Sequence, residues 1–496
     1  MRLDYPTTFI AGIAEACNPI LACETRSENA PAAVNPVQCY GAQIRRKVFN
    51  RILQIKDEYE KAVNDQRASC DDGQYHNRFA SRESGSGMTI PACVLLMMCM
   101  QGGDIHNELI NSRLFHPSSV PSVSSYCHVR DKIPLDIIED FFHWVVEEYY
   151  WTDPSMNLSE ALHIMAVDGS ELQYPPNPSE PDNYVKTRSQ TKARNCVHMN
   201  CCVDTTRNFV VDIIIQDAHK KDERDANYTF IKRIASRFSN PDVRRSYLFT
   251  TDRGYEAWNL PVIADHYGVS FLCRIKSEDS NGILAGLKDL LPCGRNSFDR
   301  TITLRLTRDP SKKGQPGYHY LSPSTYCELC TKDHEYDITL RILKVRISDK
   351  LTEYLFTNLP KYKYDKQCMV RFYHRRWPCE TSFEVVKFTL CLSATHAASN
   401  VPVRKEIFCR FAMFDLSSTL FNKLNVLEKK EDTGRKYDYV QDISSAMADI
   451  RAYFLSSLDY DIDTVVRRIT RPDRENEPTE RNKNPRHPTS FGHRMG

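Results

Sequence analysis

The chain has 496 residues with 66 basic and 64 acidic side chains, which gives a formal net charge of +2. This length allows two or three domains with a large core. The near-neutral charge excludes an argument for nucleic-acid binding from net charge alone, so basic residues would have to act in local patches. The 18 cysteines are scattered, which indicates reduced thiols inside a cell and excludes a small disulfide-stapled secreted domain.

The sequence predicts no membrane segment. The longest apolar run, Ala92–Met100, is too short to span a bilayer, and the first residues lack the basic region and long apolar run of a signal peptide. We therefore expect a cytoplasmic protein without a membrane partner.

Residues 1–90 are predicted to be a partly helical N-terminal region that ends in a linker. Arg45–Val63 has apolar residues at helical spacing together with a basic face, which favours a helix. Gln74–Gly87 is polar and rich in Ser and Gly, which is typical of a linker.

Residues 91–155 are predicted to be a helical domain. Asp104–Phe115 is a helical pattern with Asp104 as its cap, and Val123–Ile133 is a short helix that begins after Ser122. A short helix, a turn and a second helix that exposes polar and basic residues resemble a helix-turn-helix DNA reader. The alternative is an ordinary helical bundle.

Residues 156–275 are predicted to form the first part of an α/β core. Leu162–Asp168 and Ser246–Asp252 are apolar strands that each end in an acid, with a glycine close behind. Asn195–Asp204 and Phe209–Gln216 are strands joined by a hairpin turn. Since α/β proteins commonly place their sites at the ends of strands, we expect both aspartates on a sheet rim.

Carboxylates on a sheet rim suit a divalent metal. Mg²⁺ prefers oxygen ligands and is usually held by one or two carboxylates with substrate phosphate and water, and two such ions about 3.5–4 Å apart can serve both the attacking and the leaving oxygen. For Asp168 or Asp252 alone, a strand-end turn or a helix cap is the alternative. A third acid, Glu380, favours the metal interpretation.

This third acid lies in the stretch Tyr373–Lys387. Successive steps of three, four and seven residues separate four side chains there: Tyr373, Arg376, Glu380 and Lys387. Such steps return to one face of a helix, and a carboxylate beside two cations and a phenol suits a phosphodiester next to a metal. A solvated charged stripe on an amphipathic helix is the alternative.

Pro378 indicates where this helix begins. Proline is tolerated in the first helical turn and disfavours helix in the residue before it, so the helix is expected to start near Trp377. The residues before that point would lie on the segment that enters the helix. Only Glu380, Glu384 and Lys387 would then share a helical face.

These motifs resemble a known family, the cut-and-paste DDE transposases of bacterial insertion sequences that carry the signature Tyr-x2-Arg-x3-Glu-x6-Lys. The four side chains of Tyr373–Lys387 fit this signature at every spacing. Ala166–Ser170 is similar to the family's first aspartate motif, and Thr251–Tyr255 is similar to its second. The resemblance covers roughly residues 90–430.

The resemblance implies an RNase H-like fold with Asp168 on the first strand, Asp252 on the fourth strand and Glu380 on a later helix. These three catalytic residues would bind two Mg²⁺ ions, for which Mn²⁺ could substitute. They would hydrolyse DNA at the ends of the element, and the freed 3′-OH would then join target DNA. Glu384 lies one turn after Glu380 and is the rival carboxylate; we favour Glu380 because it alone fits the signature.

The resemblance also implies that Tyr373, Arg376 and Lys387 bind DNA phosphates near the cleaved end, a role that suits the fork of arginine and the point charge of lysine. The partner would be double-stranded DNA, both the element ends and the target. A homodimer would hold two ends together, associated with the nucleoid of a bacterium. Two alternatives stay open: an RNase H-like nuclease without strand transfer, and a catalytically inactive DNA-binding relic.

Residues 276–362 are predicted to be a β-rich insertion domain, because Phe298–Leu306, Tyr336–Ile347 and Leu351–Asn358 alternate as strands do. Related transposases that open DNA through a hairpin place a tryptophan in this segment to stack on a flipped base. This chain has no tryptophan there, which leaves the hairpin route open. The aromatic residues that could take its place are Phe298, Tyr318 and Tyr320.

A zinc site is a further alternative within this segment. Cys327 and Cys330 have a common zinc-ligand spacing, and His334 follows them. A structural zinc site needs four ligands and no second pair lies nearby, so a loop with reduced thiols is favoured.

The remaining chain completes the predicted core and adds a tail. Residues 363–430 would be the second part of the core, with the catalytic helix. Residues 431–496 would be C-terminal helices and a basic flexible tail, which could either contact DNA phosphates or only aid solubility.

Overall fold

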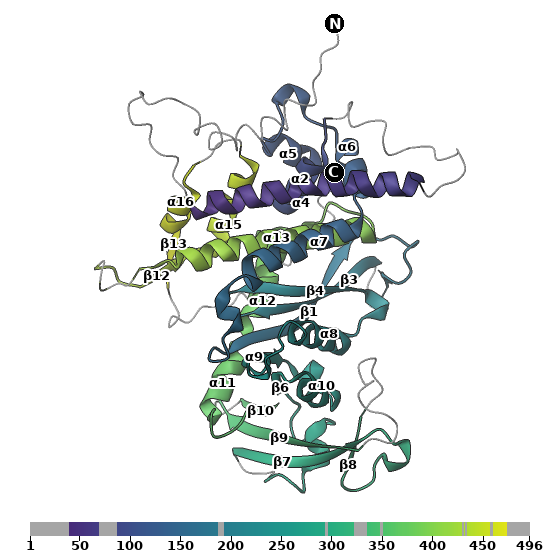
Figure 1. Ribbon diagram of the computed structural model, residues 1–496, viewed down its shortest axis with the longest axis vertical. Helices are drawn as coiled ribbons and strands as arrows, with labels where there is room; N and C mark the ends of the chain where they lie inside the picture. The colour runs from purple at the N-terminus through teal and green to yellow at the C-terminus, as the bar shows by residue number, and fades with distance from the viewer. Residues whose placement is uncertain are drawn as a thin grey trace. The chain divides into compact units, whose positions relative to one another are not determined.

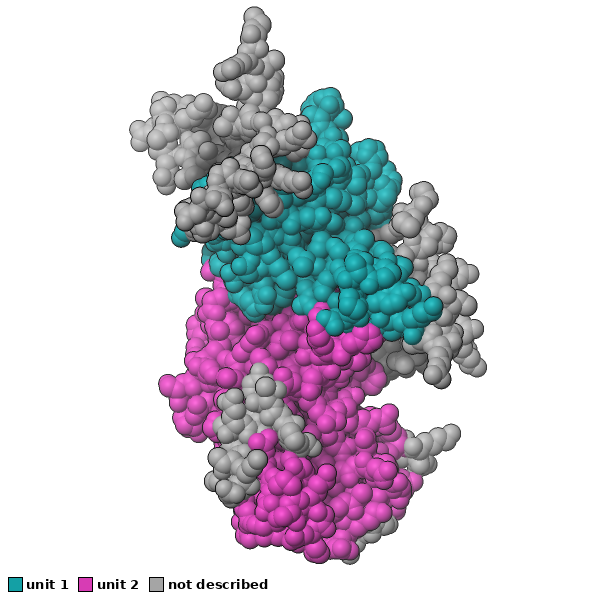
Figure 2. Space-filling view, turned by 90° about the vertical axis from the view of Figure 1, so that its right-hand side faces the viewer, with its two compact units in different colours: residues 1–145, 173–195, 384–496 teal, residues 146–172, 196–383 magenta. Residues whose placement is uncertain are grey.

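The structure is a computed structural model, and the stretches of chain that it describes are residues 39–68, 87–186, 193–292, 296–321, 335–347, 351–428, 431, 434–456 and 460–473. This chain divides into two compact units, coloured separately in Figure 2. We call residues 146–172 and 196–383 the sheet unit. The helical unit comprises residues 1–145, 173–195 and 384–496. In the described part of the chain, no helix is long and apolar enough to cross a membrane.

Some predicted features lie outside the described residues. They are most of the Ser/Gly-rich linker, the zinc candidate Cys327, Cys330 and His334, and the basic tail beyond residue 473.

Five strands form the core of the sheet unit, in the spatial order β4-β3-β1-β5-β6. β1 (His163–Tyr174) pairs in parallel with β5 (Tyr247–Thr251), which pairs in parallel with β6 (Ser270–Arg274). β3 (Arg194–Asp204) and β4 (Phe209–Asp217) form an antiparallel hairpin. The first strand of the chain is thus central, with the hairpin on one side and two parallel strands on the other. This confirms the predicted RNase H-like α/β core.

Helices lie beside this sheet (Figure 1). Local sequence signals determine where these helices begin and end. α8 (Glu223–Ala235) begins after Asp222, whose carboxylate accepts a hydrogen bond from the Asp225 amide at 3.0 Å. α10 (Asn259–Tyr267) contacts α8 and β6 and ends at Gly268, whose φ of 70° is left-handed and therefore suits glycine. The short helix α9 (Pro241–Ser246) leads into β5.

The predicted β-rich insertion extends the same sheet. Its strands are β7 (Phe298–Thr307), β8 (Tyr318–Tyr320), β9 (Glu335–Arg346) and β10 (Thr352–Thr357). β10 pairs antiparallel with β6, and the order then continues through β9 and β7 to β8. The three long strands lie within about one residue of their predicted bounds. The sheet therefore runs without a break from the core into the insertion.

The helical unit is built around α4 (Ile90–Cys99), in which all ten residues are buried. A helix that is apolar on all sides must be enclosed, and four other described helices of the unit pack against it. These are α2 (Tyr40–Ala68), α6 (Val123–Lys132), α13 (Asn400–Leu424) and α15 (Ile443–Leu455). Figure 1 shows α2 and α4 side by side, with α13 next to them.

The predicted short helices after α4 are present with the predicted caps. α5 (Ile105–Asn111) is capped by Asp104, and α6 (Val123–Lys132) is capped by Ser122. α7 (Leu135–Val146) follows, with Phe142 packed against Phe408 of α13. Smaller elements of the unit are β2 (Tyr184–Val185), α16 (Ile462–Arg468) and the sheet of β11 (Leu427–Glu428), β12 (Tyr439–Gln441) and β13 (Thr470–Pro472).

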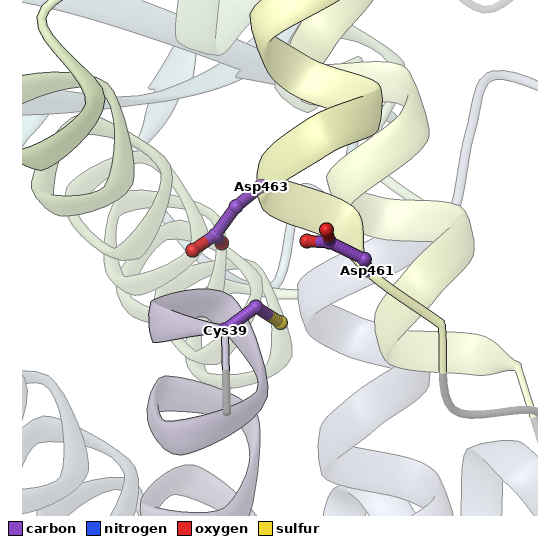
Figure 3. A group of neighbouring side chains, drawn as sticks. All are labelled: Cys39, Asp461 and Asp463. Carbon is purple, nitrogen blue, oxygen red and sulfur yellow. The ribbon is translucent and has the colours of Figure 1, made fainter. Parts of the chain in front are cut away.

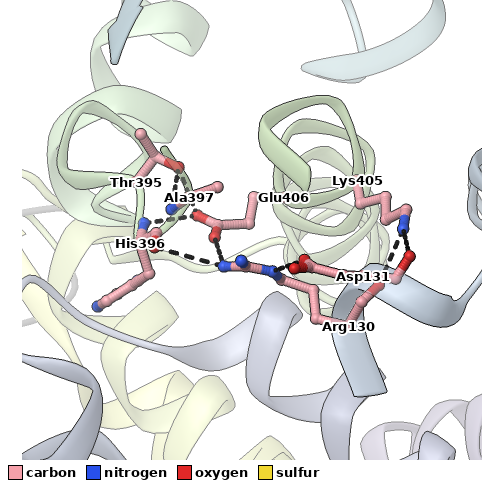
Figure 4. Close-up of polar contacts among 7 residues, drawn as sticks. All are labelled: Arg130, Asp131, Thr395, His396, Ala397, Lys405 and Glu406. Atoms are coloured by element: carbon pink, nitrogen blue, oxygen red, sulfur yellow. Dashed lines mark hydrogen bonds and ion pairs between the residues drawn. The ribbon is translucent and has the colours of Figure 1, made fainter. Parts of the chain in front are cut away.

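A buried polar network fastens α6 to α13 (Figure 4). Arg130 of α6 lies 3.4 Å from the Glu406 carboxylate, and both side chains are almost fully buried. Glu406 also accepts hydrogen bonds from the Thr395 hydroxyl at 2.8 Å and the His396 amide at 3.0 Å. Lys405 donates to the Arg130 carbonyl at 2.8 Å, near the end of α6. The network satisfies charges that would otherwise be costly to bury.

Candidate active site

Asp168 lies on β1 just beyond the part of this strand that pairs with β5. The last such pair is Ala166 with Thr250, so the Asp168 side chain is at the rim formed by the end of β5. The prediction that the strand ends at Asp168 is wrong, because β1 continues to Tyr174. The Asp168 carboxylate accepts a hydrogen bond from the Gly169 amide at 2.9 Å, and 23% of its side chain is exposed.

Asp252 is the first residue after β5, as predicted. Its carboxylate caps a short 3-10 turn, Arg253–Tyr255, by accepting a hydrogen bond from the Gly254 amide at 2.8 Å. The Arg224 side chain of α8 donates to the Gly254 carbonyl at 3.3 Å. The turn that presents Asp252 is therefore fixed both by its own cap and by the start of α8.

Arg376 connects the first aspartate with the third acid. Its guanidinium Nη1 lies 3.3 Å from Asp168 Oδ2, and its Nη2 lies 2.6 Å from Glu380 Oε1. Arg376 occupies the turn between α11 (Lys366–His374) and α12 (Trp377–Glu384), so the helix that carries Glu380 begins at Trp377 as predicted. Residues far apart in the sequence thus meet in one ion-pair network.

The electrostatics of this network follow from partial burial of several charges. Burial raises the pKa of Asp168 to about 6; Arg376 opposes the rise, and the charges of Asp252 and Glu380 add to it. Burial also raises the pKa of Tyr373, whose ring centroid lies 5.8 Å from the Arg376 guanidinium carbon. Negative charge is concentrated around Asp168, with Arg376 as its compensating cation.

Comparison with known proteins gives the family. A family model described as "Transposase DDE domain" matches residues 161–416, which is more than half of the chain. The chain belongs to this family. All six predicted site residues lie within the matched segment. The function is therefore that of a DNA transposase.

A solved structure titled as the piggyBac transposase synaptic complex with hairpin DNA is also similar to the transposase described here. The two share 11% sequence identity with a TM-score of 0.43, over 92% of this chain and 90% of that one. No curated protein matches the chain.

The candidate metal ligands of the transposase are not gathered into a tight cluster. Among the described residues, the group of His, Cys, Asp and Glu side chains whose ligand atoms all lie within 4.8 Å of one another is Cys39, Asp461 and Asp463 (Figure 3). Asp463 accepts hydrogen bonds from the amides of Tyr40 and Gly41 at 2.6 and 2.9 Å, and Asp461 caps α16. These two carboxylates thus serve as helix caps in the helical unit.

The predicted carboxylates nevertheless fit a divalent cation in their chemistry. Asp168, Asp252 and Glu380 offer only oxygen ligands, the kind that Mg²⁺ prefers. The Arg376 guanidinium already lies between Asp168 and Glu380, so a positive charge is accommodated at this position. These are the residues that could hold a metal in the sheet unit.

A histidine–carboxylate pair beside the site was not found from the sequence. His198 of β3 is buried, and its Nε2 lies 3.1 Å from Glu223 Oε1 at the start of α8. A Cβ atom added to Gly169 would lie 2.5 Å from the same nitrogen and 3.0 Å from Glu223 Oε1. The pair therefore packs directly against the backbone that follows Asp168. The only sequence signal was the position of Glu223 after a helix cap.

The hydroxyl of Tyr255 is a second feature that the sequence did not reveal. Tyr255 is 1% exposed, and its hydroxyl has no hydrogen-bond partner among the described residues. Burial raises the pKa of this phenol, and the charges of Glu223, Asp168 and Asp252 raise it further. The Tyr255 hydroxyl is therefore close to the carboxylates of Glu223, Asp168 and Asp252.

Two predicted residues of the signature region lie outside the sheet unit. Glu384, the rival carboxylate, is the last residue of α12 and is exposed. Lys387 is half-buried in a π-helical turn, Val385–Thr389. The prediction that Lys387 shares a helical face with Glu380 assumed α-helical spacing throughout. That spacing ends at Glu384, because the π turn that follows contains an extra residue.

Proposed function

We propose that the transposase cleaves the ends of its own insertion sequence and joins them to target DNA, with Asp168, Asp252 and Glu380 as the catalytic carboxylates. The observation that carries this proposal is the Arg376 bridge, with its contacts of 3.3 Å to Asp168 and 2.6 Å to Glu380. It brings a strand residue and a helix residue of the signature into one network. The carboxylate of Asp252 lies near enough for its charge to raise the pKa of Asp168.

The three carboxylates would hold two Mg²⁺ ions, with Mn²⁺ as a substitute. Bound metal of this kind supplies activation of the attacking oxygen and stabilisation of the leaving oxygen in phosphodiester hydrolysis. The chain's own part is to fix the ligands: the Gly169 amide orients Asp168, and the capped turn orients Asp252.

The cations of the signature would bind the DNA. Arg376 can exchange a carboxylate for a phosphate, since its planar fork suits both. Tyr373 lies beside Arg376 and would add a hydroxyl contact to the same phosphate region. Lys387 would supply a further point charge to the DNA backbone.

The helical unit would read the sequence of the element's ends. On α6, Ser124 and His128 are exposed, whereas Tyr126 and Arg130 face inward. The buried network that ties α6 to α13 would hold such a reading helix rigid. A homodimer would bring two ends together, and a bacterial cell would be the setting, with the protein on the nucleoid in the cytoplasm.

A first experiment separates the candidate functions. Purified protein is mixed with labelled DNA that carries the sequences flanking its gene, in Mg²⁺ and in EDTA. We expect Mg²⁺-dependent cleavage and joining that Glu380→Gln abolishes. Glu384→Gln is the matched control, since the same change falls one helical turn away, and it should retain activity.

Other outcomes select the alternatives. Cleavage without joining would favour a nuclease that lacks strand transfer. Binding without cleavage by the wild type would sink the enzymatic proposal and leave a DNA-binding relic. Loss of activity in Glu384→Gln but not in Glu380→Gln would reassign the third carboxylate.

A further inference from the structure

A basic pocket lies in the sheet unit where the turn after β5, the end of β6 and β10 meet. Its volume is about 350 Å³, which is in the range of ligand sites. Six of its lining residues carry the argument: Arg253, Arg274, Lys276, Ser277, Ser280 and Tyr354. Three of these are cations and two are serines, and no acid lines the pocket.

The cations of the pocket are free of ion pairs with acids. Among the residues that the structure describes, no carboxylate lies within ion-pair distance of Arg253, Arg274 or Lys276. Two nearby acids are engaged elsewhere. Glu278 binds Lys344 at 2.6 Å, and Glu353 lies 3.3 Å from His374. The pocket is therefore lined by three cations that form no ion pair with a described carboxylate.

The loop that presents Lys276 and the serines is held in place. Glu256 accepts hydrogen bonds from the backbone amides of Lys276, at 2.9 Å, and Ile283. Gly282 makes this possible, because a Cβ atom there would lie 2.5 Å from the Glu256 carboxylate. The Ser280 hydroxyl donates to the Ser277 carbonyl at 2.7 Å and closes the turn. A site fixed in this way loses little entropy when an anion binds.

Two residues of the pocket connect it to the candidate active site. Arg253 directly follows Asp252 in the capped turn. Arg274 is the last residue of β6 and lies next to Tyr373. Burial raises the pKa of Tyr373, and the Arg274 charge partly opposes this rise. An anion in the pocket would therefore be close to the carboxylates and yet separate from them.

We propose that the basic pocket binds a backbone phosphate of the DNA strand, close to the phosphate that is cleaved. This proposal rests on the proposed function, because it takes the carboxylates as the cleavage site. Arginine forks and a lysine, together with the hydroxyl of Ser277, are groups that bind phosphodiesters, whereas the Ser280 hydroxyl is used to close the turn. The pocket would thereby hold the strand in register with the carboxylates.

The test is a scan of single neutral substitutions in the DNA. A labelled element end is synthesised with one phosphate at a time replaced by an uncharged methylphosphonate, and binding is measured in EDTA so that no cleavage occurs. The proteins compared are the wild type, Lys276→Gln and the control Lys288→Gln, an exposed lysine of the same segment that does not line the pocket. Unchanged thermal unfolding midpoints show that the variants fold.

We expect Lys276→Gln to weaken DNA binding about five- to tenfold and to reduce the slope of log K against log salt by about 1. At one phosphate position, the methylphosphonate should weaken binding by the wild type and by Lys288→Gln, but cause no further loss in Lys276→Gln. Additive losses at every position, or wild-type binding by Lys276→Gln, would overturn the proposal.

Inorganic phosphate distinguishes the source of the anion. If phosphate binding, followed by ³¹P line broadening, depends on Lys276 while the DNA scan shows no coupled position, the pocket takes a free anion and the proposal is wrong. The scan also separates this inference from the catalytic proposal. If one phosphate position is coupled to Lys276 but no Mg²⁺-dependent cleavage is seen, the pocket proposal is supported and the catalytic proposal is refuted. If cleavage is seen but all losses are additive, the catalytic proposal is supported and the pocket proposal is refuted.

Discussion

A Cβ atom at residue 169 would lie only 2.5 Å from the Nε2 atom of His198. The strand that carries Asp168 therefore packs against the buried His198 and its partly exposed partner Glu223, and residue 169 has no room for a side chain. His198 is 2% exposed and sits in the core hairpin, so it has little freedom to move away.

We predict that Gly169→Ala destabilises the protein by about 1–3 kcal/mol, the usual cost of forcing a methyl group into a packed interior. Urea unfolding at neutral pH measures the effect. Gly286→Ala is the matched control, because a Cβ atom there meets nothing within 4 Å. The control should be neutral or slightly stabilising, and equal midpoints for the two variants would contradict the packing argument.

The fate of this strand shows what the sequence could and could not predict. The apolar run up to Val167 predicted the first half of β1 correctly. Gly169 and Ser170 indicated a turn, yet the strand continues with Leu172 and Tyr174 buried. That alternation is typical of a half-exposed strand, and the tight packing on His198 explains the glycine instead.

Local signals therefore predicted the elements better than the contacts between them. The caps Asp104 and Ser122 act within one turn of chain, and both are present. The Arg376 bridge to Asp168 and the antiparallel pairing of β10 with β6 depend on distant residues that meet only in the folded chain. No spacing rule within one segment contains that information.

The pKa of Asp168 leads to a prediction about stability and pH. The pKa of about 6 in the folded protein is above the ordinary value of 3.8 for an aspartate, so the folded protein binds this proton more tightly than the unfolded chain does. The contribution of Asp168 protonation to the free energy of unfolding is fully present below pH 4 and is lost as the pH rises through 6. The difference amounts to about 3 kcal/mol at most.

The measurement is chemical denaturation in EDTA from pH 4 to pH 7. The side chain of residue 168 cannot titrate in Asp168→Asn. As the pH rises, the free energy of unfolding of the variant should therefore increase relative to that of the wild type. A constant difference between the two proteins across this window would show that the pKa of Asp168 is not raised.

The same pKa bears on metal binding. A proton on Asp168 competes with a cation for the carboxylate, so we expect the affinity for Mg²⁺ to fall as the pH drops below about 6. Titration calorimetry at pH 5.0 and pH 7.5 measures this difference. Glu384→Gln should keep the wild-type pH dependence, whereas binding that is equally strong at both pH values would argue against Asp168 as a ligand.

The buried ion pair of the helical unit gives the last prediction. Glu406 is 1% exposed and binds Arg130, the Thr395 hydroxyl and the His396 amide, so Glu406→Gln would remove the buried carboxylate that faces the Arg130 charge. We expect a loss of about 3–5 kcal/mol in the free energy of unfolding, as is usual when one partner of a buried pair is removed.

Asp131→Asn is the control. Asp131 also pairs with Arg130, but its side chain is 52% exposed, so its loss should cost less than about 1 kcal/mol. Thermal unfolding of the two variants measures both effects. Similar losses would mean that Arg130 depends on the exposed carboxylate as much as on the buried one.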